Sequence, residues 1–249
     1  MFDHGCAYTA QLLDISDIVT KRKEGYCEAV KKWPDARLSE AQTLLAAMRL
    51  APGDKLVEFG QSQLNWHESI PAGVSYHQID PLNEPGLGLG DPVFSKQDSV
   101  DWIVSTYGMQ TCLQKKPIFD TFSHALRPGG QLILAEISQG SRVAKFMEQW
   151  VNGHSSSGVG GSYFNFRTLK ELSDSGFTLL RMQEKTCHWI FKDERAAVEY
   201  CKALLGVDLA EDQAFLDALD FYLGFDDLEE GLGLRWQMQV ISSIKTTRT

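Results

Sequence analysis

The sequence has few of the features that mark secreted, metal-binding or membrane-spanning proteins. Its 249 residues include only five cysteines, an odd number, with no Cys-x-x-Cys pair and no secretion-type segment ahead of them. Disulfide frameworks need paired cysteines and zinc sites need closely spaced ones, so we expect reduced thiols, a cytoplasmic location and no bound metal. No apolar run approaches the roughly 20 residues of a membrane helix, so we expect no membrane association.

Positive charge is also scarce. The formal net charge is −9, and the longest basic run is Lys21-Arg-Lys23. Binding to a phosphate backbone requires clustered Lys and Arg side chains, so a nucleic-acid partner is disfavoured and a small-molecule substrate is expected. The length favours one α/β domain with additions over two small domains.

One apolar stretch runs directly into a glycine turn. Leu56, Val57 and Phe59 predict a short buried strand, and Gly60 begins the turn that follows it. Ligands of open α/β sheets bind at the carboxyl ends of such strands. Glu58 could accept hydrogen bonds from a ligand there, although an acid at this position, taken alone, more often caps a helix.

A second strand is predicted over residues 73–80. It ends in Asp80, 22 residues after Glu58 (80 − 58), and this spacing fits one βαβ unit. Asp80 could therefore hold a ligand at the same sheet edge, or it could form a turn before Pro81. Only 21 residues (101 − 80) separate Asp80 from Asp101, and they are rich in Pro and Gly, which predicts an irregular crossover with at most a short strand.

Later segments give these two strands a context. The strand Asp101-Trp-Ile-Val-Ser-Thr106, a helical run to Ala125 and the turn Leu126-Arg-Pro-Gly-Gly130 follow one another. With the first strand, they resemble the class I S-adenosylmethionine-dependent methyltransferases over roughly residues 38–185, especially the branch that modifies small molecules and sterols. The turn at Leu126 carries much of this resemblance.

The resemblance implies a fold and a division of the chain. The expected fold is α/β and Rossmann-like, a doubly wound, mostly parallel seven-stranded sheet with an antiparallel last strand and a shortened crossover after the second strand. Helices are expected over 38–50, capped by Ser39, and in an insertion at about 193–223, whereas the acidic residues 226–230 predict a solvated loop. A helical cap over 1–37 would precede the Rossmann-like domain at 38–249.

The resemblance also implies a site for S-adenosylmethionine. The family's cofactor loop has three glycines, and these positions hold Gly60, Ser62 and Leu64, so only the first glycine is present. Gly90-Asp91 matches a pair that contacts the adenine in the family. The residues that the resemblance assigns to the cofactor are Glu58, Gly60, Gln61, Ser62, Asp80 and Asp91.

Substrate and catalytic residues are expected beside this site. Tyr107, Met109 and Tyr163 are candidates for substrate contacts, and ordinary core packing is the alternative for Met109. The loop 153–162 is rich in Gly and Ser and is expected to be a flexible lid. His154, within it, is the first candidate for a general base and His67 the second; the alternative for His154 is an exposed loop histidine.

Methyl transfer from S-adenosylmethionine needs little acid–base machinery, because the sulfonium is already a good leaving group. The leading hypothesis is therefore methyl transfer to a small, partly apolar metabolite. Two alternatives stay open. The fold could catalyse another reaction, such as a cyclisation, elimination or isomerisation, or the chain could be an inert subunit that stabilises an active methyltransferase. Both a homo-oligomer and a hetero-oligomer are compatible with the sequence.

Overall fold

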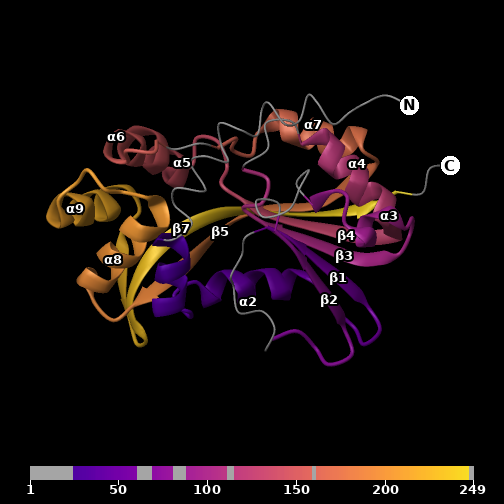
Figure 1. Ribbon diagram of the computed structural model, residues 1–249, viewed down its shortest axis with the longest axis horizontal. Helices are drawn as coiled ribbons and strands as arrows, with labels where there is room; N and C mark the ends of the chain where they lie inside the picture. Colours follow the sequence, from indigo (N-terminus) through magenta and orange to yellow (C-terminus); the bar gives the residue numbers. More distant parts are fainter. Residues whose placement is uncertain (1–24, 61–68, 81–87, 111–114, 159–160, 247–249) are drawn as a thin grey trace.

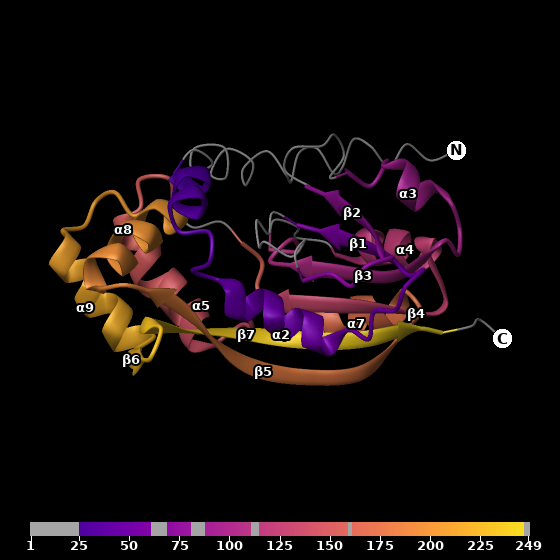
Figure 2. The ribbon, with the colours of Figure 1, turned by 90° about the horizontal axis from the view of Figure 1, so that it is seen from below.

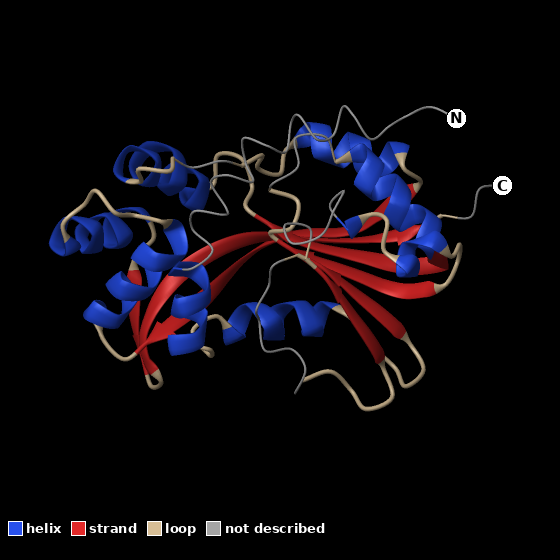
Figure 3. Cartoon of the chain, viewed as in Figure 1, coloured by secondary structure: helices blue, strands red, loops and turns tan. Residues whose placement is uncertain are grey.

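A single seven-stranded sheet runs through the molecule (Figure 3). The computed structural model describes residues 25–60, 69–80, 88–110, 115–158 and 161–246. The strand order is β2-β1-β3-β4-β7-β5, and β6 pairs with β7 outside this order. The strands are β1 (Lys55–Phe59), β2 (Ser75–Ile79), β3 (Val100–Thr106), β4 (Leu126–Glu136), β5 (Phe177–Phe191), β6 (Phe225–Leu228) and β7 (Gly231–Lys245).

The directions of the strands confirm the predicted topology. Strands β2, β1, β3 and β4 are parallel to one another, whereas β7 is antiparallel to both β4 and β5. The central strands are buried on both faces, which is why β1 and β3 read as nearly continuous apolar runs. The sheet is therefore mostly parallel with an antiparallel last strand.

Helices cover both faces of the sheet (Figures 1 and 2). Helix α2 (Leu38–Ala47) packs its Ala41 and Leu44 against one face, formed by residues of β1, β3, β4 and β7. Three helices share a core with the other face: α3 (Pro92–Ser95), α4 (Lys116–Ala125) and α7 (Phe166–Asp174). This arrangement is the doubly wound architecture that the sequence predicts.

A further group of helices, here called the helical lobe, packs around the carboxyl-terminal end of β5 and the amino-terminal end of β7 (Figures 1 and 2). Strand β6 pairs with β7 in the same region. Helix α8 begins where the Asp193 side chain accepts a hydrogen bond from the Ala196 amide, and it ends at Gly206, whose φ of +67° is left-handed. The lobe consists of α5 (Arg142–Phe146), the π-helix η2 (Met147–Val151), α6 (Asn152–His154), α8 (Glu194–Leu205) and α9 (Asp212–Tyr222). Helices α8 and α9 lie within residues 193–223, where helices were expected.

Two local predictions were wrong, those for Ser39 and for residues 225–228. Ser39 does not cap α2, because its hydroxyl donates instead to the carbonyl of His188 on β5. The described part of the crossover, residues 88–99, contains the short helix α3 and no strand, in keeping with the prediction of at most a short strand, and Asp91 lies at the start of α3. Residues 225–228 form β6 rather than a solvated loop, because Arg235 on β7 donates to the Asp226 carboxylate.

The predicted helical cap is described only in part. Residues 25–32 are helical, and Ala29 and Trp33 pack against the core of the helical lobe. The earlier part of the predicted cap lies outside the described residues. Across the described residues, no helix is both long and apolar enough to span a membrane.

Candidate active site

The carboxyl ends of the four parallel strands meet along one edge of the sheet, here called the ligand edge. Phe59 on β1 is paired with Ile79 on β2, and the Gly60 amide continues this ladder by donating to the Ile79 carbonyl over 3.0 Å. The Tyr107 amide likewise donates to the carbonyl of Ala135 on β4, at 2.9 Å. The residues that follow these strands therefore lie side by side.

Two glycines at the ligand edge bring the turns after β1 and β3 into backbone contact. A Cβ atom on Gly108 would lie 2.6 Å from the carbonyl oxygen of Phe59 and 3.1 Å from Cα of Gly60. A Cβ atom on Gly60 would in turn lie 3.0 Å from the carbonyl oxygen of Thr106. A side chain at Gly108 would overlap this backbone, so the close approach depends on glycine.

Two acids predicted to bind the cofactor end the first two strands. Glu58 is fully buried, and its carboxylate accepts a hydrogen bond from the hydroxyl of Tyr76 on β2. Burial and this carboxylate raise the pKa of Tyr76, so the tyrosine remains a donor. Asp80 directly follows β2, beside Gly60. Glu58 is therefore part of the strand pair and not a helix cap.

The other residues predicted to hold the cofactor are placed less directly. The Asp91 carboxylate accepts from the Val93 amide at 2.8 Å and lies 3.1 Å from Nε2 of His77, so it begins α3. Gln61, Ser62 and His67 lie outside the described residues, as does Leu64. Their roles remain predictions.

A third acid, Glu136, ends β4 at the same edge and was not identified as a site residue from the sequence. It is 1% exposed, and its Oε1 accepts a hydrogen bond from the Met109 amide at 2.9 Å. Burial raises the pKa of Glu136 to about 8, against the opposing effects of the Lys115 ammonium and the Met109 amide. An acid near the carboxyl end of an apolar strand is the feature that identified Glu58, and it could have identified Glu136.

A short segment crosses the ends of β3 and β4. The Ser162 amide donates to the Gln110 carbonyl at 2.8 Å, and the Phe164 amide donates to the Ile137 carbonyl at 2.9 Å. The buried Lys115 ammonium donates to the Ser162 carbonyl at 3.2 Å. Tyr163 lies between these anchors, and burial raises its pKa to about 12, so its hydroxyl stays protonated. Tyr163 thus lies at the ligand edge, and its role as a substrate contact stays a prediction.

The other predicted substrate residues are already engaged within the protein. The side chain of Met109 is completely buried in the core beneath α4, so its packing matches the alternative interpretation. The Tyr107 hydroxyl donates to Glu40 on α2 at 2.8 Å and accepts from the Trp236 indole at 3.0 Å. The backbones of both residues lie at the ligand edge.

His154 is the last residue of α6, in the helical lobe. Its ring stacks on Trp150 with centroids 4.0 Å apart, and Nδ1 lies 2.8 Å from the Trp150 carbonyl oxygen. A carbonyl can only accept, so Nδ1 is the donor and Nε2 carries the lone pair of the neutral ring. This part of the loop was predicted to be flexible, but the His154 carbonyl accepts from the Leu209 amide at 3.1 Å and the Ser156 amide donates to the Asp208 carboxylate at 2.8 Å.

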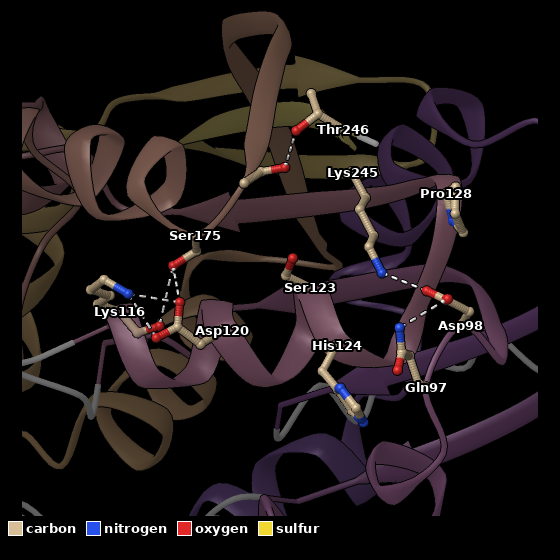
Figure 4. Close-up of a pocket in the computed structure, with 11 residues that line it drawn as sticks. Gln97, Asp98, Lys116, Asp120, Ser123, His124, Pro128, Ser175, Lys245 and Thr246 are labelled. Atoms are coloured by element: carbon tan, nitrogen blue, oxygen red, sulfur yellow. Dashed lines mark hydrogen bonds and ion pairs between the residues drawn. The ribbon is translucent and has the colours of Figure 1, made fainter. Parts of the chain in front are cut away.

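The opposite, amino edge of the sheet has a different chemistry. The Asp101 carboxylate accepts from the Lys55 amide at 2.8 Å and pairs with Arg127, so it joins β1, β3 and the turn that opens β4. Beside this turn lies an open, polar pocket of about 540 Å³ (Figure 4). Its lysines are paired with its own carboxylates, Lys245 with Asp98 and Lys116 with Asp120, so the described side chains offer no free charge to a ligand. Among the described residues, no cluster of His, Cys, Asp or Glu could hold a metal ion.

Solved structures provide the comparison for this arrangement. A protein of Bacillus halodurans assigned as a methyltransferase matches 84% of the chain with 100% of its own, at 12% identity and a TM-score of 0.52. A S-adenosylmethionine-dependent methyltransferase of Thermotoga maritima matches 92% of the chain with 99% of its own, at 15% identity and a TM-score of 0.53. A protein of Haloferax volcanii assigned as a methyltransferase, solved in complex with the Trm112 activator, matches 92% of the chain with 98% of its own, at 15% identity and a TM-score of 0.50.

These likenesses define the fold. The chain has the fold of the class I S-adenosylmethionine-dependent methyltransferases, as its strand order and antiparallel β7 also indicate. No protein-family model matches the sequence, and no curated protein matches it significantly.

The residues at the ligand edge fit the expected cofactor. A side chain at Gly60 or Gly108 would press on the backbone of the neighbouring turn, and Asp80 directly follows β2 at the same edge. The hydroxyls of Ser105 and Thr106 at the end of β3 are buried and have no hydrogen-bond partner among the described residues. Buried polar atoms of this kind favour a ligand that hydrogen-bonds. The ligand edge therefore combines hydrogen-bonding hydroxyls and a carboxylate with two turns whose backbones lie close together.

Proposed function

We propose that this protein transfers a methyl group from S-adenosylmethionine to a small, partly apolar metabolite. The observation that carries the proposal is the backbone contact between Gly60 and Gly108, with Asp80 at the adjoining strand end. In an open α/β sheet this is where a ligand approaches the strand ends. The fold of the chain supports the same assignment.

Each part of the ligand edge has a role in this proposal. Asp80 would accept hydrogen bonds from the cofactor's ribose, and Gly60 would allow the rest of the cofactor to approach the backbone. When bound, the cofactor supplies an electrophilic methyl group on a sulfonium. The protein's own contribution is to orient the acceptor and to exclude water. Partly buried aromatic side chains against the core of the helical lobe would provide the apolar wall for the acceptor: Trp33, Tyr107, Trp150 and Tyr163.

His154 remains our proposed general base for an acceptor that must lose a proton. Its Nδ1 is directed to a carbonyl, so the lone pair on Nε2 is the atom that could take the proton. A His154→Gln variant tests this role. We expect a lower kcat with an unchanged dissociation constant for S-adenosylhomocysteine, whereas an unchanged kcat would exclude His154 as the base.

The decisive experiment is calorimetric titration of the purified protein with S-adenosylhomocysteine, after removal of any copurified ligand. We expect binding that Asp80→Asn weakens at least tenfold. Asp101→Asn is the matched control, because it changes an acid of the same sheet at the amino edge, and it should bind like the wild type. A wild-type protein that does not bind would refute the proposal. Recovery of binding in Leu64→Gly would then identify Leu64 as the block.

Assembly is a separate prediction. The Haloferax volcanii neighbour was solved with an activator protein, and this chain could likewise form a homo- or hetero-oligomer. Mass measurement of the native protein tests this prediction. A stable hetero-oligomer with an active methyltransferase, together with no turnover by the chain alone, would favour the inert-subunit alternative.

A further inference from the structure

A buried carboxylate on α2, Glu40, collects hydrogen bonds from three different parts of the chain. Its side chain is fully buried. Oε1 accepts from the Tyr107 hydroxyl and from the Trp189 indole, both at 2.8 Å, and Oε2 accepts from the Arg37 guanidinium at 2.8 Å. Trp236 stacks on Trp189 at 4.0 Å and donates to the Tyr107 hydroxyl at 3.0 Å. We call these five residues the Glu40 cluster.

The charges of the Glu40 cluster are balanced within the protein. Arg37 is only 7% exposed, and its guanidinium lies over the rings of Tyr107 and Trp189 at 5.4 and 5.3 Å. Burial opposes the guanidinium charge, but Glu40 beside it raises the pKa of Arg37 above its usual value, so the guanidinium stays charged. Buried ion pairs add little net stability compared with apolar packing, and they impose a defined geometry on their neighbours.

One member of the Glu40 cluster has a strained backbone at the ligand edge. Tyr107 has a φ of +55°, and only one other described non-glycine residue, Asp98, has a positive φ. A left-handed conformation is unfavourable for a bulky residue, so the surrounding structure must hold it. The next residue, Gly108, makes the close contact with Phe59 and Gly60.

We propose that Glu40 is a positioning residue for the ligand edge. By accepting the hydrogen bond of Tyr107 it holds the left-handed turn after β3, and this turn sets Gly108 against Gly60. Helix α2 and the strands β5 and β7 are thereby connected to the cofactor site through one hydroxyl group. The inference rests on the proposed function for its consequence in binding, but the local geometry can be tested without any ligand.

The test compares two variants that each remove one hydrogen bond to the same oxygen of Glu40. Tyr107→Phe removes the bond at the ligand edge, and Trp189→Phe removes the bond from β5, within the same buried cluster. Amide hydrogen exchange is measured at Met109 and Gln110, whose amides donate to Glu136 and to the Tyr107 carbonyl after the turn. The dissociation constant for S-adenosylhomocysteine and the urea midpoint are measured in parallel.

We expect Tyr107→Phe to accelerate exchange at Met109 and Gln110 at least tenfold and to weaken S-adenosylhomocysteine binding by a similar factor. Trp189→Phe should lower the urea midpoint yet change exchange and binding less than twofold. Glu40→Leu, which removes both acceptor oxygens, should behave like Tyr107→Phe if it folds. If it does not fold, the comparison of Tyr107→Phe with Trp189→Phe is the deciding test. Equal exchange in the Tyr107→Phe and Trp189→Phe variants, or no change in either, would overturn the inference. If the wild type binds no S-adenosylhomocysteine, the proposed function fails while the exchange measurement still decides this inference.

Discussion

Acidic residues lie at both edges of the sheet, the amino edge and the ligand edge, but their surroundings differ. At the amino edge, Asp101 pairs with Arg127 and with a backbone amide, so its charge is satisfied within the framework. At the ligand edge, Glu136 is buried with a raised pKa, and Tyr107 is held in a left-handed conformation. The turn at Leu126, which carries much of the resemblance to the methyltransferases, lies at the amino edge, where Asp101 and Arg127 join neighbouring strands. The site of the proposed methyl transfer lies at the opposite edge.

The largest difference between the edges should appear when a methyl group is added to a glycine at each. In Gly108→Ala the new Cβ would lie 2.6 Å from the Phe59 carbonyl, so we expect a loss of about 1–3 kcal/mol in unfolding free energy and at least a hundredfold loss of S-adenosylhomocysteine affinity. Gly129→Ala is the control, because its Cβ meets no atom within 4 Å. Its φ of +79° costs about 1–2 kcal/mol, but binding should not change.

Urea titration and calorimetry of the two glycine variants give the comparison. Equal losses of affinity would show that the contact between Gly60 and Gly108 has no special place in binding.

A pH-dependent difference should follow from Glu136. The folded-state pKa of about 8 lies above the ordinary value of 4.5, so the folded protein binds this proton more tightly than the unfolded chain. The resulting stability is complete below about pH 4.5 and is lost as the pH rises toward 8, with a slope on the order of 1 kcal/mol per pH unit. Glu136→Gln should remove this slope. Urea unfolding at several pH values tests it, and parallel curves for the two proteins would contradict the prediction.

The framework could be predicted from the sequence because local signals agree with the fold. Apolar runs ended by glycine gave β1 and β3, and the order of segments around Leu126 gave the topology. Two failures have a common cause: a side chain paired with a distant residue. Ser39 bonds to β5, and Asp226 pairs with Arg235 across a hairpin. Such long-range partners override local propensity.

Residues of the candidate active site could be predicted only where the sequence of a single strand indicated them. Glu58 lies one residue before the end of β1, and Asp80 directly follows β2. The Glu40 cluster could not be predicted, because it joins residues from α2, β5, β7 and the turn after β3 that are remote in sequence. Tyr107 was predicted to contact substrate, yet its hydroxyl is bonded to Glu40.

A smaller effect is expected from Asp101, the acid that joins neighbouring strands at the amino edge. Asp101→Ala removes the acceptor of the Lys55 amide and the partner of Arg127, so we expect a loss of about 1–2 kcal/mol in unfolding free energy. Affinity for S-adenosylhomocysteine should be preserved, because the ligand edge lies at the other end of the strands. Urea unfolding and calorimetry check both parts, and a loss of affinity comparable to that of Asp80→Asn would mean that the two edges are coupled.

The smallest effect should come from the pocket at the amino edge. Lys116 and Asp120 pair at 2.7 Å one helical turn apart on the surface of α4, with side chains 46% and 49% exposed. Such exposed pairs contribute about 0.3–0.5 kcal/mol, and salt screens them. Lys116→Gln should therefore shift the urea midpoint only slightly, and the shift should vanish at high salt. Lys170→Gln on α7, which breaks a similar exposed pair with Asp174 outside the pocket, is the control. If Lys116→Gln instead lowered affinity for S-adenosylhomocysteine while Lys170→Gln did not, the pocket would communicate with the ligand edge and the two edges could no longer be treated as independent.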